Sequence, residues 1–272
     1  MQIRFFCPRW GAEQLPLDKF LRQVKKAGYD GVEMPLPPEA EEQKILKEGL
    51  ATHGLLWIGQ HYETLRTDFD QHLIEIEQRF RTLALAGPLF INSQTGKDYF
   101  SYEQNAALIG AGLRVEKETG VTILHETHRG KFSFAAHVTR QFLEGLPDLK
   151  ITLDISHWFT VAETFLQDQQ EALDLAISRA EHIHSRVGFT EGPQIGDPRA
   201  PEWKDVLQTH LDCWDRIVDR HRSAGRPFFT ITPEFGPAPY MPLQPYILRP
   251  LADQWDVNIY MMHLLKERYA TS

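Results

Sequence analysis

Short apolar or β-branched segments alternate along the chain with longer stretches in which apolar residues recur at helical spacing. Eight such segments are predicted to be strands, at residues 3–6, 31–34, 55–59, 89–93, 121–126, 151–156, 182–187 and 228–234. The stretches that separate them are long enough for a helix. Because parallel neighbours in a sheet need helical crossovers, this alternation predicts a parallel sheet.

The intervening stretches carry helix signals. Apolar residues at helical spacing predict helices over 69–86 and 202–224. Ser101 followed three residues later by Gln104 is a capping-box pattern that opens a helix over about 102–118, and Gly120 suits its end. Gly28 ends the first helix in the same way.

Eight strand–helix units in about 250 residues favour a (β/α)₈ TIM barrel with its active site at the C-terminal ends of the strands. We expect one such domain over residues 1–272, because no linker or low-complexity run divides the chain. A doubly wound open sheet is the structural alternative, although no glycine-rich phosphate-binding motif opens any strand–helix turn. The proline-rich stretch 236–250 is predicted to be a loop after the last strand, either covering a site or lying on the surface.

Composition narrows the class of protein. The formal net charge of −8 disfavours general affinity for nucleic acid or an anionic membrane. Two cysteines, Cys7 and Cys213, are too few for a disulfide framework and suit a reducing compartment. No apolar run is long enough to span a membrane and no secretory signal opens the chain, so we expect a cytoplasmic protein without nucleic-acid or membrane partners.

Ionisable residues cluster where the predicted strands end. The run "VTILHETHRGK" at 121–131 is one example, and it is either a site or a polar surface turn. The strand-end candidates are Glu33, His61, Glu126, His128, Arg129, Asp154, His157, His184, Arg186 and Glu234. Singly, each has an ordinary structural reading as a helix cap, an ion-pair partner or a buried histidine. Strand alternation places His125 toward the helices, and only one of His182 and His184 is expected to face the barrel interior.

Four of these residues end the last four strands in succession: Glu126, Asp154, His184 and Glu234. Three carboxylates at one barrel mouth would repel one another unless a cation neutralised them. Three oxygen ligands and one imidazole nitrogen suit Mn²⁺, Mg²⁺, Co²⁺ or Zn²⁺. We therefore predict one divalent metal ion at this position.

At these residues the chain resembles the xylose isomerase-like TIM barrels, in strand order and in the spacing of Asp154 and His157. The resemblance implies a sugar isomerase or epimerase in which Glu126 and Glu234 are both metal ligands and the acid/base pair. It also implies that His157 binds substrate and that Glu33 lines the substrate pocket. We add His61, His128, Arg186 and Arg199 as candidate substrate-binding residues.

The chain also departs from that pattern. Related 3-epimerases carry a substrate-binding Arg several residues beyond the strand-seven ligand, where this chain has Thr190; Arg186 and Arg199 are the candidates to replace it. The Asp-x-His of endonuclease IV reads Asp197-Pro198-Arg199 here, which disfavours DNA cleavage, although His61 and His157 could serve a second metal.

The expected activity is therefore that of a metal-dependent isomerase or epimerase acting on a keto sugar, sugar phosphate or keto-inositol through a cis-enediolate. A dehydratase of the same substrates, an endonuclease IV-like phosphodiesterase and a non-catalytic sugar-binding barrel stay open. The expected partner is a small carbohydrate, and self-association into a homo-oligomer is left open.

Overall fold

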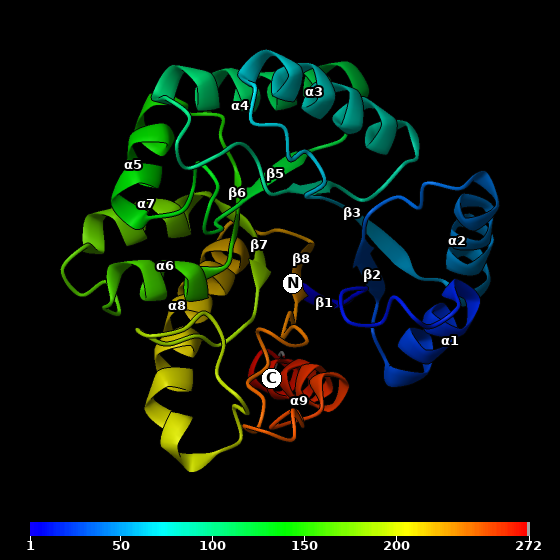
Figure 1. Cartoon of the computed structure of the whole chain (residues 1–272), viewed down its shortest axis with the longest axis vertical. Helices are drawn as coiled ribbons and strands as arrows, with labels where there is room; N and C mark the ends of the chain where they lie inside the picture. Colours follow the sequence, from blue (N-terminus) through cyan, green and yellow to red (C-terminus); the bar gives the residue numbers. More distant parts are fainter. Residues whose placement is uncertain (271–272) are drawn as a thin grey trace.

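The chain folds into a closed barrel of eight parallel strands (Figure 1). In a computed structural model that describes residues 1–270, each strand pairs with the next along the chain, and β8 pairs with β1 to close the ring. The strands are β1 (Gln2–Pro8), β2 (Gly31–Met34), β3 (Leu56–His61), β4 (Ile91–Ser93), β5 (Ile123–Glu126), β6 (Ile151–Leu153), β7 (Ala180–His184) and β8 (Phe228–Thr232). The predicted barrel is confirmed, and the open sheet is excluded because no strand edge remains unpaired.

Helices form a ring outside the barrel, with α9 lying between α8 and α1 (Figure 1). They are α1 (Leu17–Ala27), α2 (Ala40–His53), α3 (Phe69–Leu85), α4 (Tyr102–Thr119), α5 (Ala136–Gly145), α6 (Ile155–Ala162), α7 (Gln170–Arg179), α8 (Lys204–Ser223) and α9 (Gln254–Arg268), with a short 3₁₀ turn η1 (Pro201–Trp203) before α8. The predicted capping box of Ser101 and Gln104 is present at α4, and Gly28 and Gly120 end α1 and α4 in the left-handed conformation. Within residues 1–270, no helix is both long and apolar enough to cross a bilayer.

Two predicted strands extend three residues past the C-terminal ends of the observed strands. The strand predicted over 151–156 ends at Leu153, because the side chain of Asp154 accepts a hydrogen bond from the Ser156 backbone and caps α6. The strand predicted over 182–187 begins at Ala180 and ends at His184. The caps and loops at these boundaries place polar side chains directly above the strands.

The barrel interior is layered from apolar at the bottom to polar at the top. Phe6, Ile58, Phe90 and Leu124 form a separate buried cluster, which we call the apolar floor. The ring of Phe90 packs against that of His182, 5.2 Å away, so the polar residues begin directly above the floor. Side chains two residues further along each strand face the same way, which carries the polar layers toward the strands' C-terminal ends.

His210 of α8 anchors the loop that follows β7. Its Nδ1 bonds to the Val206 carbonyl at 2.9 Å, and its Nε2 accepts the Gly188 backbone N–H at 3.2 Å. The ring is fully buried, and burial lowers its pKa to about 4. Protonation of Nε2 would remove the acceptor that Gly188 uses.

We expect acid to destabilise the protein through this ring. The unfolded state takes up a proton near the ordinary histidine pKa of about 6.5, whereas the folded ring takes one up only near 4, so stability is lost as pH falls between these values. The loss from one such ring approaches about 3 kcal/mol. Chemical denaturation of the parent and His210→Gln should show a flatter pH dependence in the variant, while His137→Gln, at an exposed position, should match the parent. Equal pH dependence in the parent and His210→Gln would refute this role.

Candidate metal centre and substrate cavity

The structure brings the four predicted ligands together at the C-terminal ends of β5 to β8. Ligand atoms of Glu126, Asp154, His184 and Glu234 all lie within 4.8 Å of one another, and all four residues are buried. His184 Nδ1 lies 2.9 Å from Glu234 Oε2 and 3.7 Å from Glu126 Oε1. This buried nitrogen nevertheless makes no well-aligned hydrogen bond. A ring nitrogen that is surrounded by carboxylate oxygens without bonding to them fits a position where all the atoms face a common cation.

Glu33 of β2 sets the orientation of the His184 ring. Its Oε1 lies 2.9 Å from His184 Nε2, so that this nitrogen donates and Nδ1 is left to face the other carboxylates. A carboxylate that holds the far nitrogen of a metal-binding histidine is a recurring arrangement that fixes tautomer and direction. Glu33 does not line the cavity, so its predicted contact with substrate is replaced by a positioning contact below the centre.

Both histidines of β7 lie inside the barrel, which corrects the expectation that only one would. Residues two apart on a strand face the same side. His182 bonds to Thr230, Thr232 and Glu33, one layer below His184, and its ring centroid lies 5.3 Å from that of His184. His125, by contrast, points outward as predicted: it bonds to Thr95 and lies against Gly112 of α4.

The electrostatics of the four residues favour a cation. Burial and the carboxylates of Glu234, Asp154 and Glu33 raise the pKa of Glu126 to about 8, with His184 opposing. Burial disfavours the charged form of His184, but Glu234, Glu33 and Glu126 together outweigh it and raise its pKa well above the usual range. The same field that holds a proton on His184 Nδ1 would hold a divalent cation there.

Two other groups of residues could in principle hold a metal, and both are less suitable. In the group of Glu33, His182 and His184, the Glu33 oxygens already accept hydrogen bonds from His182, Thr232 and Asn92. In the group of Glu126, His128 and His157, His128 Nδ1 bonds to the Arg129 carbonyl. Glu126, Asp154, His184 and Glu234 therefore form the candidate metal centre.

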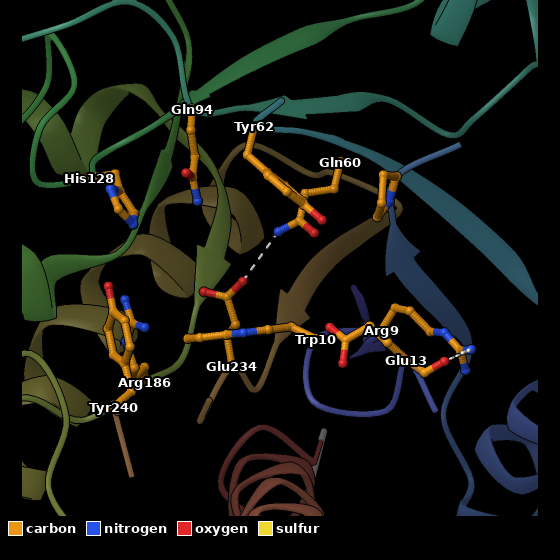
Figure 2. Close-up of a pocket in the computed structure, with 11 residues that line it drawn as sticks. Arg9, Trp10, Glu13, Gln60, Tyr62, Gln94, His128, Arg186, Glu234 and Tyr240 are labelled. Carbon is orange, nitrogen blue, oxygen red and sulfur yellow. Dashed lines mark hydrogen bonds between the residues drawn. The ribbon is translucent and has the colours of Figure 1, made fainter. Parts of the chain in front are cut away.

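Above the centre lies a cavity of about 320 Å³. Figure 2 shows Glu234 at its middle, with Arg186, Tyr240 and His128 to one side and Arg9 and Glu13 to the other. The cavity is lined by Arg9, Trp10, Glu13, Pro35, Gln60, Tyr62, Gln94, His128, Arg186, Glu234 and Tyr240. The proline-rich loop thus contributes to the site through Tyr240, whereas its tip at Tyr246 is fully exposed. Gly236 of the same loop lies so close to Trp10 that a Cβ there would meet the indole ring at 2.0 Å.

Arg186 lines the cavity, and the buried His157 lies behind it, in contact with its guanidinium group. Arg186 Nη2 lies 2.5 Å from Asp154 Oδ2 and 2.6 Å from His157 Nε2, and its Nε donates to Ser156. Burial raises the pKa of Asp154, and the Arg186 guanidinium opposes that rise. Asp154 therefore faces both the candidate metal centre and a fixed positive charge.

Two predicted substrate-binding residues lie away from the cavity. His61 faces the helices: its nitrogens bond to Ser93 and Thr64, each at 2.9 Å, and its ring packs on Phe80 of α3. Arg199 is exposed and forms a bidentate ion pair with Asp197. Neither side chain lines the cavity, in contrast to both expectations.

Three amides near the centre were missed from the sequence. Asn92 Nδ2 donates to Glu33 at 2.8 Å and to Glu126 at 3.1 Å, and Gln94 lies 3.4 Å from both Glu126 oxygens. Gln60 donates to Glu234 at 3.4 Å (Figure 2). The available signal was alternation: Gln60 follows Ile58 and Asn92 follows Phe90 at two-residue spacing, on the face that carries the apolar floor.

Known structures match this fold. No protein-family model and no curated protein sequence matches the chain. A D-allulose 3-epimerase from Methylomonas sp., in complex with D-allulose, has a TM-score of 0.65 at 16% identity over 98% of each chain. The probable 3-DHS dehydratase AsbF from Bacillus anthracis has a TM-score of 0.61 at 16% identity, over 98% of this chain and all of that one. A xylose isomerase-like TIM barrel protein from Mycobacterium smegmatis, in complex with magnesium, has a TM-score of 0.58 at 11% identity.

The molecule is thus an all-parallel (β/α)₈ barrel with a buried cluster of carboxylates and histidine at its mouth. It has the xylose isomerase-like TIM-barrel fold, as the sequence predicted. At these low identities the likeness establishes the fold alone, so the reaction has to be argued from the chain's own residues.

Proposed function

We propose that the protein is a divalent-metal-dependent isomerase or epimerase that acts on a keto sugar, sugar phosphate or keto-inositol through a cis-enediolate. One observation carries this proposal: three buried carboxylates and an imidazole nitrogen face one point at the bottom of a cavity of about 320 Å³. The solved structures of similar fold include a sugar epimerase and a magnesium-bound barrel, which agrees with this class of reaction.

Glu126 and Glu234 are the proposed acid/base pair. Glu126 ends β5 and Glu234 follows β8, three strands apart around the ring, so the two approach a molecule in the cavity from different sides. Asn92 and Gln94 hold the Glu126 carboxylate, and Gln60 holds Glu234. A positioned carboxylate can take an α-proton from the substrate, and a second can return one.

The metal ligands would be Glu126, Asp154, His184 and Glu234. A divalent ion in this position supplies Lewis-acid stabilisation of the negative charge that develops on a substrate carbonyl. Because burial and neighbouring carboxylates raise the pKa of Glu126 to about 8, this group holds a proton near neutral pH when nothing neutralises its neighbours. A divalent cation among these carboxylates would favour the ionised form of Glu126, which is the form that acts as a base.

The product depends on where the second carboxyl group delivers its proton. Return to the opposite face of the same carbon gives an epimer, and return to the neighbouring carbon gives an isomer. Loss of a β-hydroxyl group from the same enediolate would give a dehydratase. All three reactions begin with removal of the substrate's α-hydrogen, which can then exchange with solvent.

The test is hydrogen exchange in deuterated solvent, measured by NMR over a panel of ketoses, keto-inositols and their phosphates with Mn²⁺ present. We expect at least one compound to exchange its α-hydrogen and to yield an epimer or isomer. Binding without exchange would instead favour a sugar-binding barrel, and an eliminated product would favour a dehydratase. An abasic-site DNA duplex serves as a separate arm, in which we expect no nicking because the chain carries a net charge of −8 and lacks the Asp-x-His.

A further inference from the structure

His157 lies between two arginines. Arg129 Nε lies 3.1 Å from its Nδ1, and Arg186 Nη2 lies 2.6 Å from its Nε2. A neutral imidazole offers one lone pair and one N–H, so it can accept a hydrogen bond from only one of these guanidinium groups. The other guanidinium meets an N–H. His157 therefore supplies one hydrogen-bond acceptor to two guanidinium groups that each need one.

Both arginines contact Tyr240 on one side of the cavity, and Arg186 also lines the cavity itself. Arg186 is 1% exposed, and its guanidinium lies 4.8 Å from the centroid of the Tyr240 ring. Arg129 is half-buried, and its Nη2 donates to the Tyr240 hydroxyl at 3.3 Å. Within residues 1–270, Arg129 has no carboxylate partner at ion-pair distance. Asp154 and Ser156 also accept from Arg186, so the donors left for a ligand are on Nη1 of each arginine, which makes no hydrogen bond within residues 1–270.

The opposite side of the cavity is built differently. Arg9 donates to the backbone carbonyls of Glu13 and Leu15, so these donors are used by the chain itself. Glu13 adds a carboxylate on that side (Figure 2). A molecule with one anionic end would thus place that end toward Arg129 and Arg186.

We propose that Arg129 and Arg186 form an oxyanion site for a carboxylate or phosphate group of the substrate, and that an anion bound there strengthens divalent-cation binding at the adjacent metal centre. The proposal deepens the proposed function by making the substrate a keto sugar that carries a carboxylate or phosphate group. The effect on metal binding rests on that proposed function. An oxyanion supplies the acceptor that His157 lacks, and guanidinium groups match carboxylate and phosphate oxygens in pairs.

The coupling to the metal centre follows from the position of Arg186. Its Nη2 lies 2.5 Å from Asp154 Oδ2, so a cation bound by Asp154 would have this guanidinium charge close by. Like charges at that separation in a buried site repel strongly. An anion on the guanidinium offsets the repulsion, and linkage requires the metal to favour the anion by the same factor.

The first experiment measures free Mn²⁺ by electron paramagnetic resonance while the protein is titrated in chloride, acetate or inorganic phosphate at equal ionic strength. In the parent, acetate or phosphate should tighten Mn²⁺ binding about tenfold, which corresponds to about 1.4 kcal/mol of coupling. The more effective anion identifies the group as carboxylate or phosphate. Arg129→Gln should lose most of this dependence, whereas the matched change Arg199→Gln, at an exposed arginine outside the cavity, should keep it.

A second measurement does not depend on the metal. After chelator treatment, the effective anion should raise the melting temperature of the parent and of Arg199→Gln, but not that of Arg129→Gln, because a ligand that binds only the folded state stabilises it. Arg186→Gln should bind Mn²⁺ more tightly in chloride and no longer respond to the anion.

The outcomes separate the two proposals. If Mn²⁺ binds through His184 but neither anion changes its affinity or the melting temperature, the oxyanion site is wrong and the metal centre stands. If Mn²⁺ does not bind, the metal centre fails, and the melting experiment still decides whether the two arginines bind an anion. Equal anion effects in Arg129→Gln and the parent would also overturn the inference.

Discussion

Replacing Glu126 or Glu234 by Gln is expected to reduce turnover on the order of 10²–10⁴-fold, the usual contribution of a positioned general acid or base. Glutamine keeps an oxygen that can bind metal but removes the basic one. Metal affinity should therefore fall modestly, since an amide is a weaker ligand than a carboxylate, while turnover falls far more. The comparison is made with each variant saturated with Mn²⁺.

The two variants should also differ from each other. Loss of the glutamate that takes the first proton abolishes exchange of substrate hydrogen with deuterated solvent. Loss of the other leaves exchange but blocks product formation. If both variants turned over at nearly the parent rate once saturated with metal, the two glutamates would be ligands only, and His157 would be the next candidate for proton transfer.

His184→Ala is expected to lose divalent-metal binding by two orders of magnitude or more, since it removes the only nitrogen ligand of the candidate centre. Asp154→Asn should weaken binding as well. Glu33→Gln should weaken it roughly 10–100-fold although Glu33 touches no metal, because the His184 ring loses the carboxylate that orients it. Equilibrium dialysis with Mn²⁺ measures all three, with one ion per chain expected in the parent.

His61→Gln is the matched control for this series. His61 is also a buried histidine at the end of a strand, but it faces α3 rather than the cavity. Its replacement should leave Mn²⁺ affinity unchanged. Parent-like affinity in His184→Ala and Asp154→Asn would show that the metal, if any, is bound elsewhere.

The candidate metal centre could be predicted because strand ends of a closed barrel converge. The four ligands lie far apart in the sequence, but each ends or follows an apolar strand. Closure of the barrel brings the ends of these strands to one mouth, where Glu126, Asp154, His184 and Glu234 meet. Charge repulsion then supplied the reason for a cation. The fold followed from the same regular alternation of strands and helices.

Errors in the predicted site residues arose mainly where a shift of one residue decides whether a side chain faces the barrel interior. A shift of a single position along β3 exchanges His61 for Gln60 at the cavity, and the sequence of that strand is apolar on both faces, as buried parallel strands are. His182 was misjudged although its spacing from His184 placed both on one face. Arg199 could not be assigned because only the folded loop shows that Asp197 binds it.

The apolar floor limits the route by which protons can exchange with bulk water during a reaction. Phe6, Ile58, Phe90 and Leu124 close the barrel below the polar layers, so a proton that leaves Glu126 for bulk water has to pass the cavity mouth. Trp10 and Tyr240 line the cavity and are in edge-to-face contact, with ring centroids 5.0 Å apart, and a bound substrate would fill the space beside them. The hydrogen that Glu126 takes from a substrate would then reach water only through that mouth, so exchange with deuterated solvent is expected to build up over repeated turnovers.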